Sequence, residues 1–134
     1  MTPQIASPGY RPKYGPSEAE IAKTFVQYVR LKYPEESRSL IHIPNEGKRS
    51  QRQGIELKLQ GLVPGVSDYF FAIPLSRYAG LWLELKTSRG KESYAQKAFG
   101  QRMLKNGYSY HCVYGLDAAI LCFEGYLHLR PVKS

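Results

Sequence analysis

Two apolar segments with the composition of β-strands constrain this chain most, and both of them carry charge. Val66–Ile73 and Leu81–Lys86 are rich in aromatic and branched residues, and a turn-like stretch at Pro74–Gly80 separates them. An unpaired charge on a buried or half-buried strand is costly. A structural or functional reason is therefore required for the charges on these segments, which are Asp68, Glu84 and Lys86.

Signals for helices and further strands surround these two segments. Ser17 and Glu20 have the spacing of a capping box and predict a helix that ends before Pro34. Gly107 closes a second predicted helix over Tyr94–Asn106. The order of elements predicts a mixed α/β sandwich with one central sheet flanked by helices. The other predicted elements are a strand at Ser39–Pro44, a helical turn or strand at Ile55–Leu59, a strand at Tyr110–Tyr114, a short helix at Asp117–Phe123 and an edge strand at Tyr126–Leu129.

Length and charge indicate one globular domain with a polyanionic partner. The 134 residues suffice for a single core, predicted over residues 17–134, whereas residues 1–16 are rich in Pro, Gly and Tyr and predict a flexible arm. The net charge of +8 favours nucleic acid over a membrane as the partner.

The cysteines and the hydropathy of the chain favour a cytoplasmic protein. The sequence shows neither an apolar run near the roughly 20 residues of a membrane span nor a signal-peptide pattern. Cys112 and Cys122 stand in apolar surroundings outside any C-x-x-C motif. We therefore expect buried thiols in a reducing compartment, neither a disulfide nor a zinc site.

The alternation of side chains along a strand brings the charged residues together. The leucines of Leu81–Lys86 face one side of that strand, and Glu84 and Lys86 share the other side. An adjacent strand ending at Asp68 adds a second carboxylate, and two close carboxylates favour either a bound cation or a raised pKa. A partial set of oxygen ligands suits Mg²⁺ or Mn²⁺, and Lys86 would offset charge on a phosphoryl group. The competing interpretation is a surface ion pair of Glu84 with Lys86, with Asp68 as a turn residue.

The first predicted helix contributes a further acid. At 100° per residue, Glu18 projects onto the middle of the apolar stripe of this helix, whereas Glu20 projects to the opposite face. Capping and solvent account for Glu20. Glu18 points toward the core and needs a partner, for which a metal ion is one candidate.

Basic residues near these segments are candidate contacts to a phosphate backbone. Lys48, Arg49 and Arg52 form a cluster after the Ser39–Pro44 strand, and Arg89 and Lys91 follow Lys86. Such charge runs either contact phosphates or belong to a solvated loop.

Three further polar residues, which are His42, Asn45 and Gln96, are candidates for either a structural or a functional role. His42 and Asn45 stand at the end of the Ser39–Pro44 strand, where they could lie near a bound phosphate. The alternative for His42 is a core position, which is the commoner case for a lone histidine. Gln96 forms a capping box with Ser93, which by itself explains a glutamine at this position. No pair of histidines has metal-ligand spacing, so zinc is not expected.

These residues resemble the signature of the PD-(D/E)XK nucleases, in which Asp68 is followed by the pair Glu84-x-Lys86. More narrowly, they are similar to the VRR-NUC branch in its stand-alone phage and bacterial form. The resemblance runs from about Ser17 to Gly115, and Ser67 stands where the family has proline. The residues that carry it are His42-Ile-Pro-Asn45-Glu46-Gly47, Lys58-Leu-Gln-Gly61-Leu-Val-Pro64-Gly65-Val-Ser-Asp68, Leu83-Glu84-Leu85-Lys86 and Ser93-x-x-Gln96-x-x-Phe99.

The resemblance implies a restriction-endonuclease-like fold and a divalent-metal-dependent, structure-selective DNA endonuclease. It implies that Asp68, Glu84 and the backbone carbonyl of Leu85 bind Mg²⁺ or Mn²⁺, and that Lys86 is the catalytic lysine. It also implies that Glu18 is the acid of the first helix and that a glutamine such as Gln96 lies beside the active site. If the chain is phage-encoded, the cytoplasm is that of the bacterial host.

The stand-alone members of the family are associated with dimers that cut four-way (Holliday) junctions. Paired cuts in a symmetric junction call for two active sites, so we expect a homodimer, with Tyr108–Leu129 as its predicted interface. Two other functions compete with this one. They are a nucleic-acid-binding module without catalysis and a nuclease of the same superfamily that acts on plain duplex DNA.

Overall fold

A central sheet with helices on both faces makes up the part of the chain that the structure describes. This computed structural model describes residues 15–44 and 50–131. Helix α1 and helix α3 begin at the predicted capping boxes, with Ser17 and Ser93 as N-caps. The elements in chain order are α1 (Glu18–Lys32), the 3₁₀ helix η1 (Glu36–Ser39), β1 (Leu40–His42), α2 (Gln51–Leu59), β2 (Tyr69–Phe71), β3 (Leu81–Lys86), α3 (Tyr94–Lys105), β4 (Ser109–Tyr114) and α4 (Leu116–Leu127).

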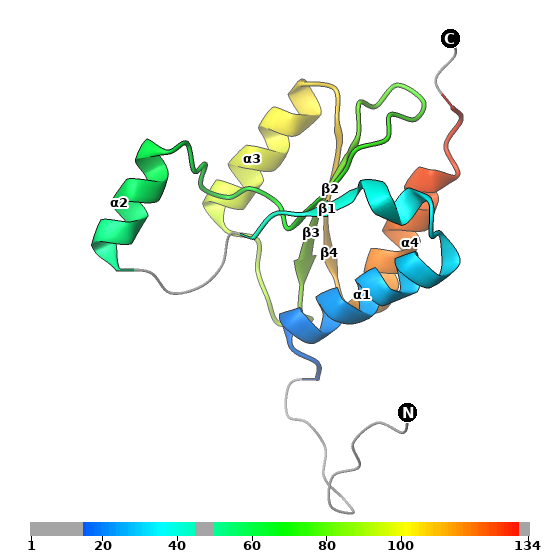
Figure 1. The fold of residues 1–134 in the computed structure, drawn as a ribbon, viewed down its shortest axis with the longest axis horizontal. Coiled ribbons are helices and arrows are strands. Elements are labelled where there is room, and N and C mark those ends of the chain that lie inside the picture. Colours follow the sequence, from blue (N-terminus) through cyan, green and yellow to red (C-terminus); the bar gives the residue numbers. More distant parts are fainter. Residues whose placement is uncertain (1–14, 45–49, 132–134) are drawn as a thin grey trace, which may run out of the picture.

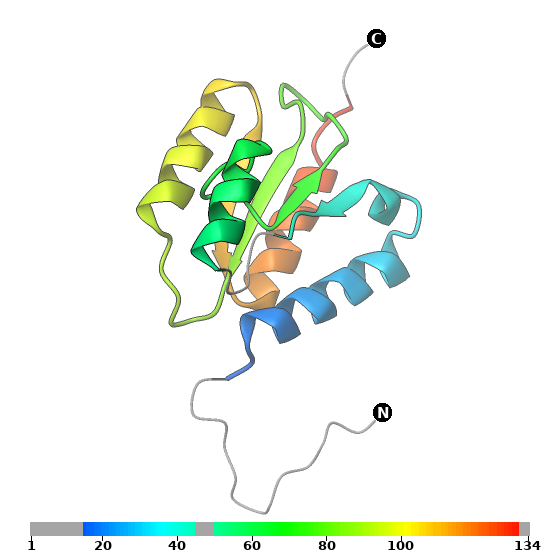
Figure 2. The ribbon, with the colours of Figure 1, turned by 60° about the vertical axis from the view of Figure 1, so that its left-hand side comes forward.

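The sheet is mixed, and its strands lie side by side in chain order. β1 pairs antiparallel with β2, β2 pairs antiparallel with β3, and β3 pairs parallel with β4. A parallel pair needs a crossover connection, which α3 supplies. Figures 1 and 2 show α1 and α4 on one face of the sheet and α3 on the other.

The alternation predicted for Leu81–Lys86 is confirmed. Leu81, Leu83 and Leu85 are each 1% exposed and belong to the core cluster that includes Phe25 of α1 and Phe123 of α4. On the other face, the Trp82 ring meets the Phe99 ring of α3 edge-on, with centroids 5.0 Å apart. β3 is therefore covered on both faces, and Glu84 is enclosed between the sheet and α3.

A carboxylate shared by three side chains ties α1 to α4. Glu124 Oε2 accepts hydrogen bonds from Tyr33 Oη at 2.6 Å, Tyr28 Oη at 2.8 Å and Lys32 Nζ at 2.8 Å. The hydrogen bonds from Lys32, Tyr33 and Tyr28 lower the pKa of Glu124 to about 2. Glu124 is thus ionised at neutral pH and fixes the end of α1 against the last helix.

Three predicted elements differ in the structure: the strand at Val66–Ile73, the short helix at Asp117–Phe123, which is α4 and extends over Leu116–Leu127, and the edge strand at Tyr126–Leu129. Strand β2 covers only Tyr69–Phe71 of the predicted Val66–Ile73, because it pairs with the three-residue β1. The predicted edge strand at Tyr126–Leu129 is wrong: Tyr126 and Leu127 end α4, and residues 128 and 129 form a turn. The Tyr126 hydroxyl donates to the Ile73 carbonyl at 2.7 Å, which packs this helix end onto the sheet side.

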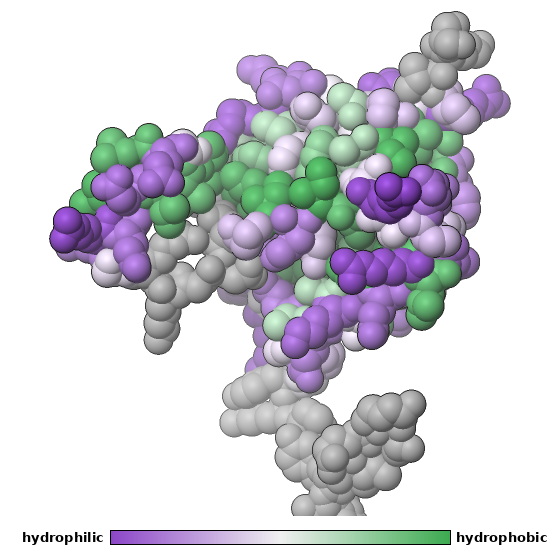
Figure 3. All heavy atoms as spheres, in the orientation of Figure 1, coloured by the Kyte–Doolittle hydropathy of each residue, from purple (hydrophilic) through white to green (hydrophobic). Residues whose placement is uncertain are grey.

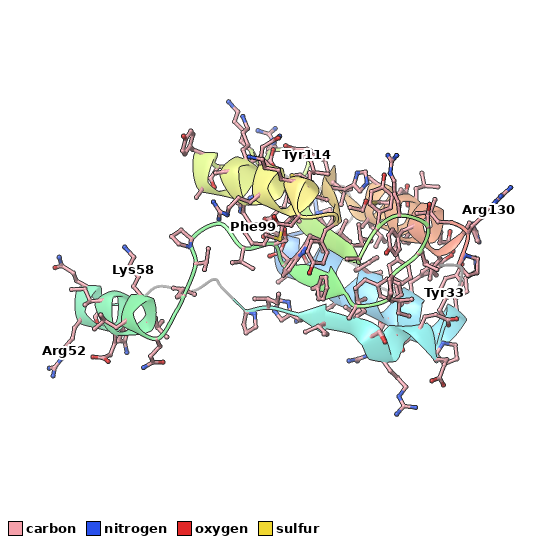
Figure 4. All side chains as sticks on the ribbon, turned by 90° about the horizontal axis from the view of Figure 1, so that it is seen from above. Tyr33, Arg52, Lys58, Phe99, Tyr114 and Arg130 are labelled. Carbon is pink, nitrogen blue, oxygen red and sulfur yellow. The ribbon has the colours of Figure 1, made fainter. Side chains whose placement is uncertain are left out.

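Helix α2 resolves the ambiguity at Ile55–Leu59 and corrects the predicted loop before it. Ser50 and Gln53 form a capping box, so that Gln51 and Arg52 are helical and not part of a loop. Every residue of α2 is at least partly exposed, and the helix stands apart from the sheet in Figure 4. Arg52 lies at the outer part of this projecting helix.

The two cysteines are free thiols, as predicted, but they are half-buried where the sequence predicted buried ones. Burial raises the pKa of Cys122 to about 11, which keeps that thiol protonated at neutral pH. Within residues 15–44 and 50–131, no helix combines the length and the apolar character needed to cross a membrane. The first 14 residues of the predicted arm lie outside the described residues.

Candidate active site

Asp68 directly precedes β2 and hydrogen bonds to β3 and to the residue that follows β1. Its Oδ2 accepts a hydrogen bond from the backbone N–H of Leu85 on β3 at 2.8 Å. Its own carbonyl accepts from the backbone N–H of Ile43, just past β1, at 2.8 Å. The carbonyl also lies 3.1 Å from Nδ1 of His42. The sheet therefore fixes both the backbone and the carboxylate of Asp68 beside the carboxyl end of β3.

Glu84 is a buried carboxylate with only one of its oxygens satisfied. The residue is 2% exposed. Its Oε2 accepts a hydrogen bond from Gln96 Nε2 at 2.9 Å and lies 3.4 Å from Lys86 Nζ. Its Oε1 is buried without a hydrogen-bond partner among the described residues. A buried carboxylate oxygen left in this state is destabilising unless a further group binds it.

The electrostatics of Glu84 follow from this burial. The pKa of Glu84 is raised from 4.5 to about 8, mainly by desolvation and also by the nearby Asp68 carboxylate, while Lys86 opposes the shift. The raised pKa is one of the two outcomes that close carboxylates favour. A cation at the two carboxylates would reverse it, because positive charge stabilises the ionised form.

Lys86 is held close to this carboxylate and away from bulk solvent. Its side chain is 12% exposed, and its ammonium forms an ion pair with Glu84 across one strand residue. The surface ion pair considered as the competing interpretation does not fit, because the Glu84 side chain is only 3% exposed. A buried pair with an unsatisfied oxygen is expensive as a structural device and points to chemistry.

Gln96 takes part in the predicted capping box and also hydrogen bonds to Glu84. Its Oε1 accepts from the backbone N–H of Ser93 at 2.8 Å, completing the capping box, while its Nε2 donates to Glu84. One amide thus orients a buried carboxylate and anchors the start of α3. Glu92 and Tyr110 support this corner, because the Tyr110 hydroxyl hydrogen bonds to the Glu92 carboxylate and lies 3.4 Å from the Gln96 carbonyl.

Glu18 and Glu20 occupy opposite sides of α1, as the helical projection predicts. Glu20 is exposed and closes the capping box with Ser17. Glu18 borders a hollow of about 30 Å³ together with Asp68 and Leu85. That volume holds one or two water-sized groups.

The residues at this hollow fit a hard divalent cation in part. Carboxylate and carbonyl oxygens suit Mg²⁺ or Mn²⁺. Asp68, Leu85 and Glu18 line the hollow, whereas Glu84 does not, although its Oε1 has no hydrogen-bond partner among the described residues. In residues 15–44 and 50–131, no three His, Cys, Asp or Glu side chains gather closely enough to hold a metal ion by themselves. The predicted ligands, which are Asp68, Glu84 and the Leu85 carbonyl, would therefore need water to complete the coordination of a cation.

The candidate DNA contacts are distributed unevenly around this site. His42 lies at the hollow, with its ring 5.0 Å from the ring of Tyr69. Arg89 and Lys91 are exposed on the loop that follows β3. Arg52 belongs to the separate helix α2. Asn45, Lys48 and Arg49 lie outside the described residues.

Sequence reasoning missed the supporting pair of Glu92 and Tyr110. Glu92 precedes the Ser93 cap and gave no motif of its own. Tyr110 reaches α3 only because Leu81 is in register with Ser109 and Trp82 with Tyr110 in the parallel β3–β4 pair. Knowledge of that register would have been needed to find the contact.

We expect the stability of the metal-free protein to fall as pH rises because Glu84 must ionise in a buried site. The pKa of Glu84 is about 8 in the folded protein, against 4.5 for a carboxyl group in the unfolded chain. Between these pH values the folded state binds more protons than the unfolded state. The stabilisation that the protonated Glu84 contributes is therefore complete below pH 4.5 and is lost as the pH rises through 8. Glu84→Gln removes this dependence. In EDTA, its free energy of unfolding should exceed that of the wild type by an amount that grows from pH 5 to pH 9, up to about 3 kcal/mol, and its melting temperature should rise above that of the wild type accordingly.

The difference between the two proteins isolates Glu84 from other titrating groups. His111, whose pKa burial lowers, is present in both proteins and cancels. A melting-temperature difference that stays constant over this pH range would contradict the raised pKa of Glu84.

The comparisons with known proteins place the fold. No protein-family model matches the chain, and no curated protein matches it. Among solved structures, the chain is similar to a protein described as a "VRR_NUC domain protein", with a TM-score of 0.80 and 21% sequence identity. The similarity covers 89% of this chain and 94% of that chain. It confirms the predicted restriction-endonuclease-like α/β fold, and the predicted resemblance to the VRR-NUC branch is confirmed at the level of the fold.

Proposed function

We propose that this chain is a nuclease of the VRR-NUC type that hydrolyses DNA phosphodiester bonds with Mg²⁺ or Mn²⁺. The observation that carries the proposal is the buried Glu84 carboxylate, which has an unpartnered oxygen, lies 3.4 Å from Lys86 and is electrostatically coupled to Asp68. The fold is similar to that of a VRR_NUC domain protein, and these residues match the nuclease signature in the sequence, which supports the proposal.

The residues that would hold the cation are Asp68, Glu84 and the carbonyl of Leu85, with Glu18 at the border of the same hollow. When bound, a divalent cation supplies Lewis-acid charge that stabilises the phosphoryl oxygens during hydrolysis. The chain contributes the geometry: the Leu85 N–H orients the Asp68 carboxylate, and the Gln96 amide orients that of Glu84.

Lys86 is the residue proposed to act on the reacting phosphate. Its ammonium is largely removed from bulk water, so its charge acts more strongly on a neighbouring phosphoryl oxygen than an exposed lysine would. Glu84 holds it at the site when no substrate is bound. His42, exposed at the same hollow, would contact the sugar–phosphate backbone next to the reacting bond.

The proposed substrate is branched DNA, and the proposed assembly is a homodimer in the bacterial cytoplasm. The net charge of +8 supports a polyanionic partner, and the free thiols support a reducing compartment. The interface remains a prediction for Tyr108–Leu129, a region that includes the sheet-edge strand β4 and the exposed Leu121 of α4.

The test incubates the protein with a four-way junction, a fork and linear duplex DNA, each with Mg²⁺, Mn²⁺ or EDTA. We expect cleavage of the junction or the fork only with a divalent ion, and its loss in Lys86→Ala. Binding of the junction without metal-dependent cutting would favour a non-catalytic module. Equal cutting of linear duplex would favour a nuclease of the same superfamily without preference for branches.

A further inference from the structure

An open groove runs along α1 from the candidate active site. It lies between α1 and the edge strand β1 and has a volume of about 740 Å³. Its floor is apolar or aromatic, with Ala22, Val26 and Tyr69, and its rim carries Lys23, Gln27 and Arg30.

The groove is continuous with the hollow beside Asp68. Ala19, Ala22, His42 and Tyr69 line both of them. Glu18 and Asp68 line the hollow but not the groove, so the acidic groups are confined to one end. Among the described residues that line the groove itself, the formal charges are the two cations Lys23 and Arg30.

The cations are spaced along one side of the helix. Lys23, Gln27 and Arg30 follow one another at four and three residues, which places them on one face of α1. All three are exposed, and hydrophilic side chains cover the α1 side of the molecule in Figure 3. Lys23 also attracts Glu20 one turn away, but Glu20 is held by Ser17.

We propose that this groove binds the backbone of the nucleic-acid strand whose phosphate reaches the hollow, with Lys23 and Arg30 on phosphates about three positions apart and Gln27 between them. The inference rests on the proposed function. Lys23 follows Glu18 by five residues, about 7.5 Å along the helix, and Arg30 lies about 10 Å further. That second span corresponds to about three phosphates of one strand of a duplex.

The shape of the groove favours a strand of nucleic acid over other occupants. A phosphate backbone needs cations at regular intervals on one side and a surface for sugars and bases on the other. The α1 rim supplies the cations. The exposed His42 ring, which packs on Tyr69, supplies the surface for sugars and bases. A second copy of this chain, adding a strand to the open edge of β1, is the alternative occupant that the experiment must detect.

The experiment measures binding separately from cleavage. A labelled fork and a labelled single strand are titrated in EDTA, by fluorescence anisotropy, at several salt concentrations. The test variant is Lys23→Gln with Arg30→Gln. The matched control is Lys105→Gln with Arg130→Gln, which removes the same charge at sites distant from the groove, the Arg130 side chain pointing outward in Figure 4. A charge-conserving variant, Lys23→Arg with Arg30→Lys, tests whether charge at these positions suffices.

We expect the test variant to bind roughly tenfold more weakly, as for the loss of two exposed ion pairs, while the control changes by less than about twofold. The salt dependence of log K should decrease by about one for each phosphate contact removed. The charge-conserving variant should bind as the wild type does. In cleavage assays, the test variant should raise KM with kcat retained.

Two outcomes would overturn the groove proposal. One is equal affinity and equal salt dependence for the test variant and the control. The other is a change in sedimenting mass of the test variant without loss of affinity, which would assign the groove to a second copy. If the wild type binds DNA through this groove but cuts no substrate, the proposed nuclease function fails and the groove stands.

Discussion

Replacing Asp68 by asparagine is expected to reduce metal-dependent DNA cleavage by about a thousandfold or more without unfolding the protein. An asparagine carbonyl oxygen can still accept the hydrogen bond that Asp68 receives from the Leu85 N–H. The substitution removes only the negative charge that would hold the cation, and such charge stabilisation is worth several kcal/mol. Gel assays of junction and fork cleavage in Mg²⁺ or Mn²⁺ measure the effect.

The contrast with alanine separates the charge of Asp68 from its hydrogen bond. Asp68→Ala leaves the N–H of Leu85, a residue 1% exposed, without its acceptor, so it should also lower the free energy of unfolding by about 1–3 kcal/mol. Asp68→Asn should keep its stability and lower the pKa of Glu84, because the Asp68 charge helps to raise it. Glu20→Gln is the control for removal of an acid outside the site, and its cleavage should match the wild type. Near-normal cleavage by Asp68→Asn would assign the chemistry to another site.

The strongest sequence signals predicted the elements that carry the site. Leu81–Lys86 is a strand with the predicted bounds, because its alternation of leucine with Trp82, Glu84 and Lys86 reflects the two covered faces of β3. The capping boxes at Ser17 and Ser93 start α1 and α3, since side-chain and backbone groups satisfy each other within four residues. Local chemistry determines these features, so the sequence alone is sufficient for them.

The errors arose where tertiary contacts decide the conformation. The predicted helix ended at Phe123, two residues before Gly125, yet α4 continues to Leu127. An added Cβ at Gly125 would meet open space, and Tyr126 is buried against Ile73, so packing stabilises the helix despite the glycine. Helix α2 was left undecided between a helical turn and a strand at Ile55–Leu59 for the opposite reason. It has no buried face, and the Ser50–Gln53 capping box was its one clear signal.

The sequence predicted that the charged residues of the candidate site lie close together, but not how Glu84 is hydrogen bonded. The helical projection separated Glu18 from Glu20, and the structure places Glu18 at the hollow. Sequence reasoning could not show that Glu84 Oε1 has no hydrogen-bond partner among the described residues, because that depends on how α3 covers β3. The groove along α1 could not be predicted from the sequence either. Lys23 and Arg30 lie on a helix face that borders a groove only because β1 lies beside it.

Replacing Gly65 by alanine is expected to destabilise the protein strongly and to displace Gln96 from Glu84. Gly65 has φ +82°, and a Cβ there would lie 2.2 Å from the Ala95 carbonyl oxygen and 2.7 Å from the Gln96 nitrogen. These are backbone atoms in the first turn of α3, which cannot move aside as a flexible side chain does. The left-handed backbone costs about 1–2 kcal/mol and the overpacking about 1–3 kcal/mol more. The melting temperature should fall by about 10 °C.

Gly61 provides the matched control for Gly65, because it also has a positive φ, of +105°, but a Cβ there would meet nothing within 4 Å. Gly61→Ala should therefore be destabilised by backbone strain alone and should keep its cleavage activity. Gly65→Ala should melt at a clearly lower temperature than Gly61→Ala and, below its own melting temperature, cut DNA more slowly because the Gln96 amide no longer orients Glu84. Equal melting temperatures and equal cleavage rates for the two variants would show that the turn before Asp68 does not position α3. The close approach of Gly65 to α3 thus links the loop that precedes one carboxylate to the helix that orients the other.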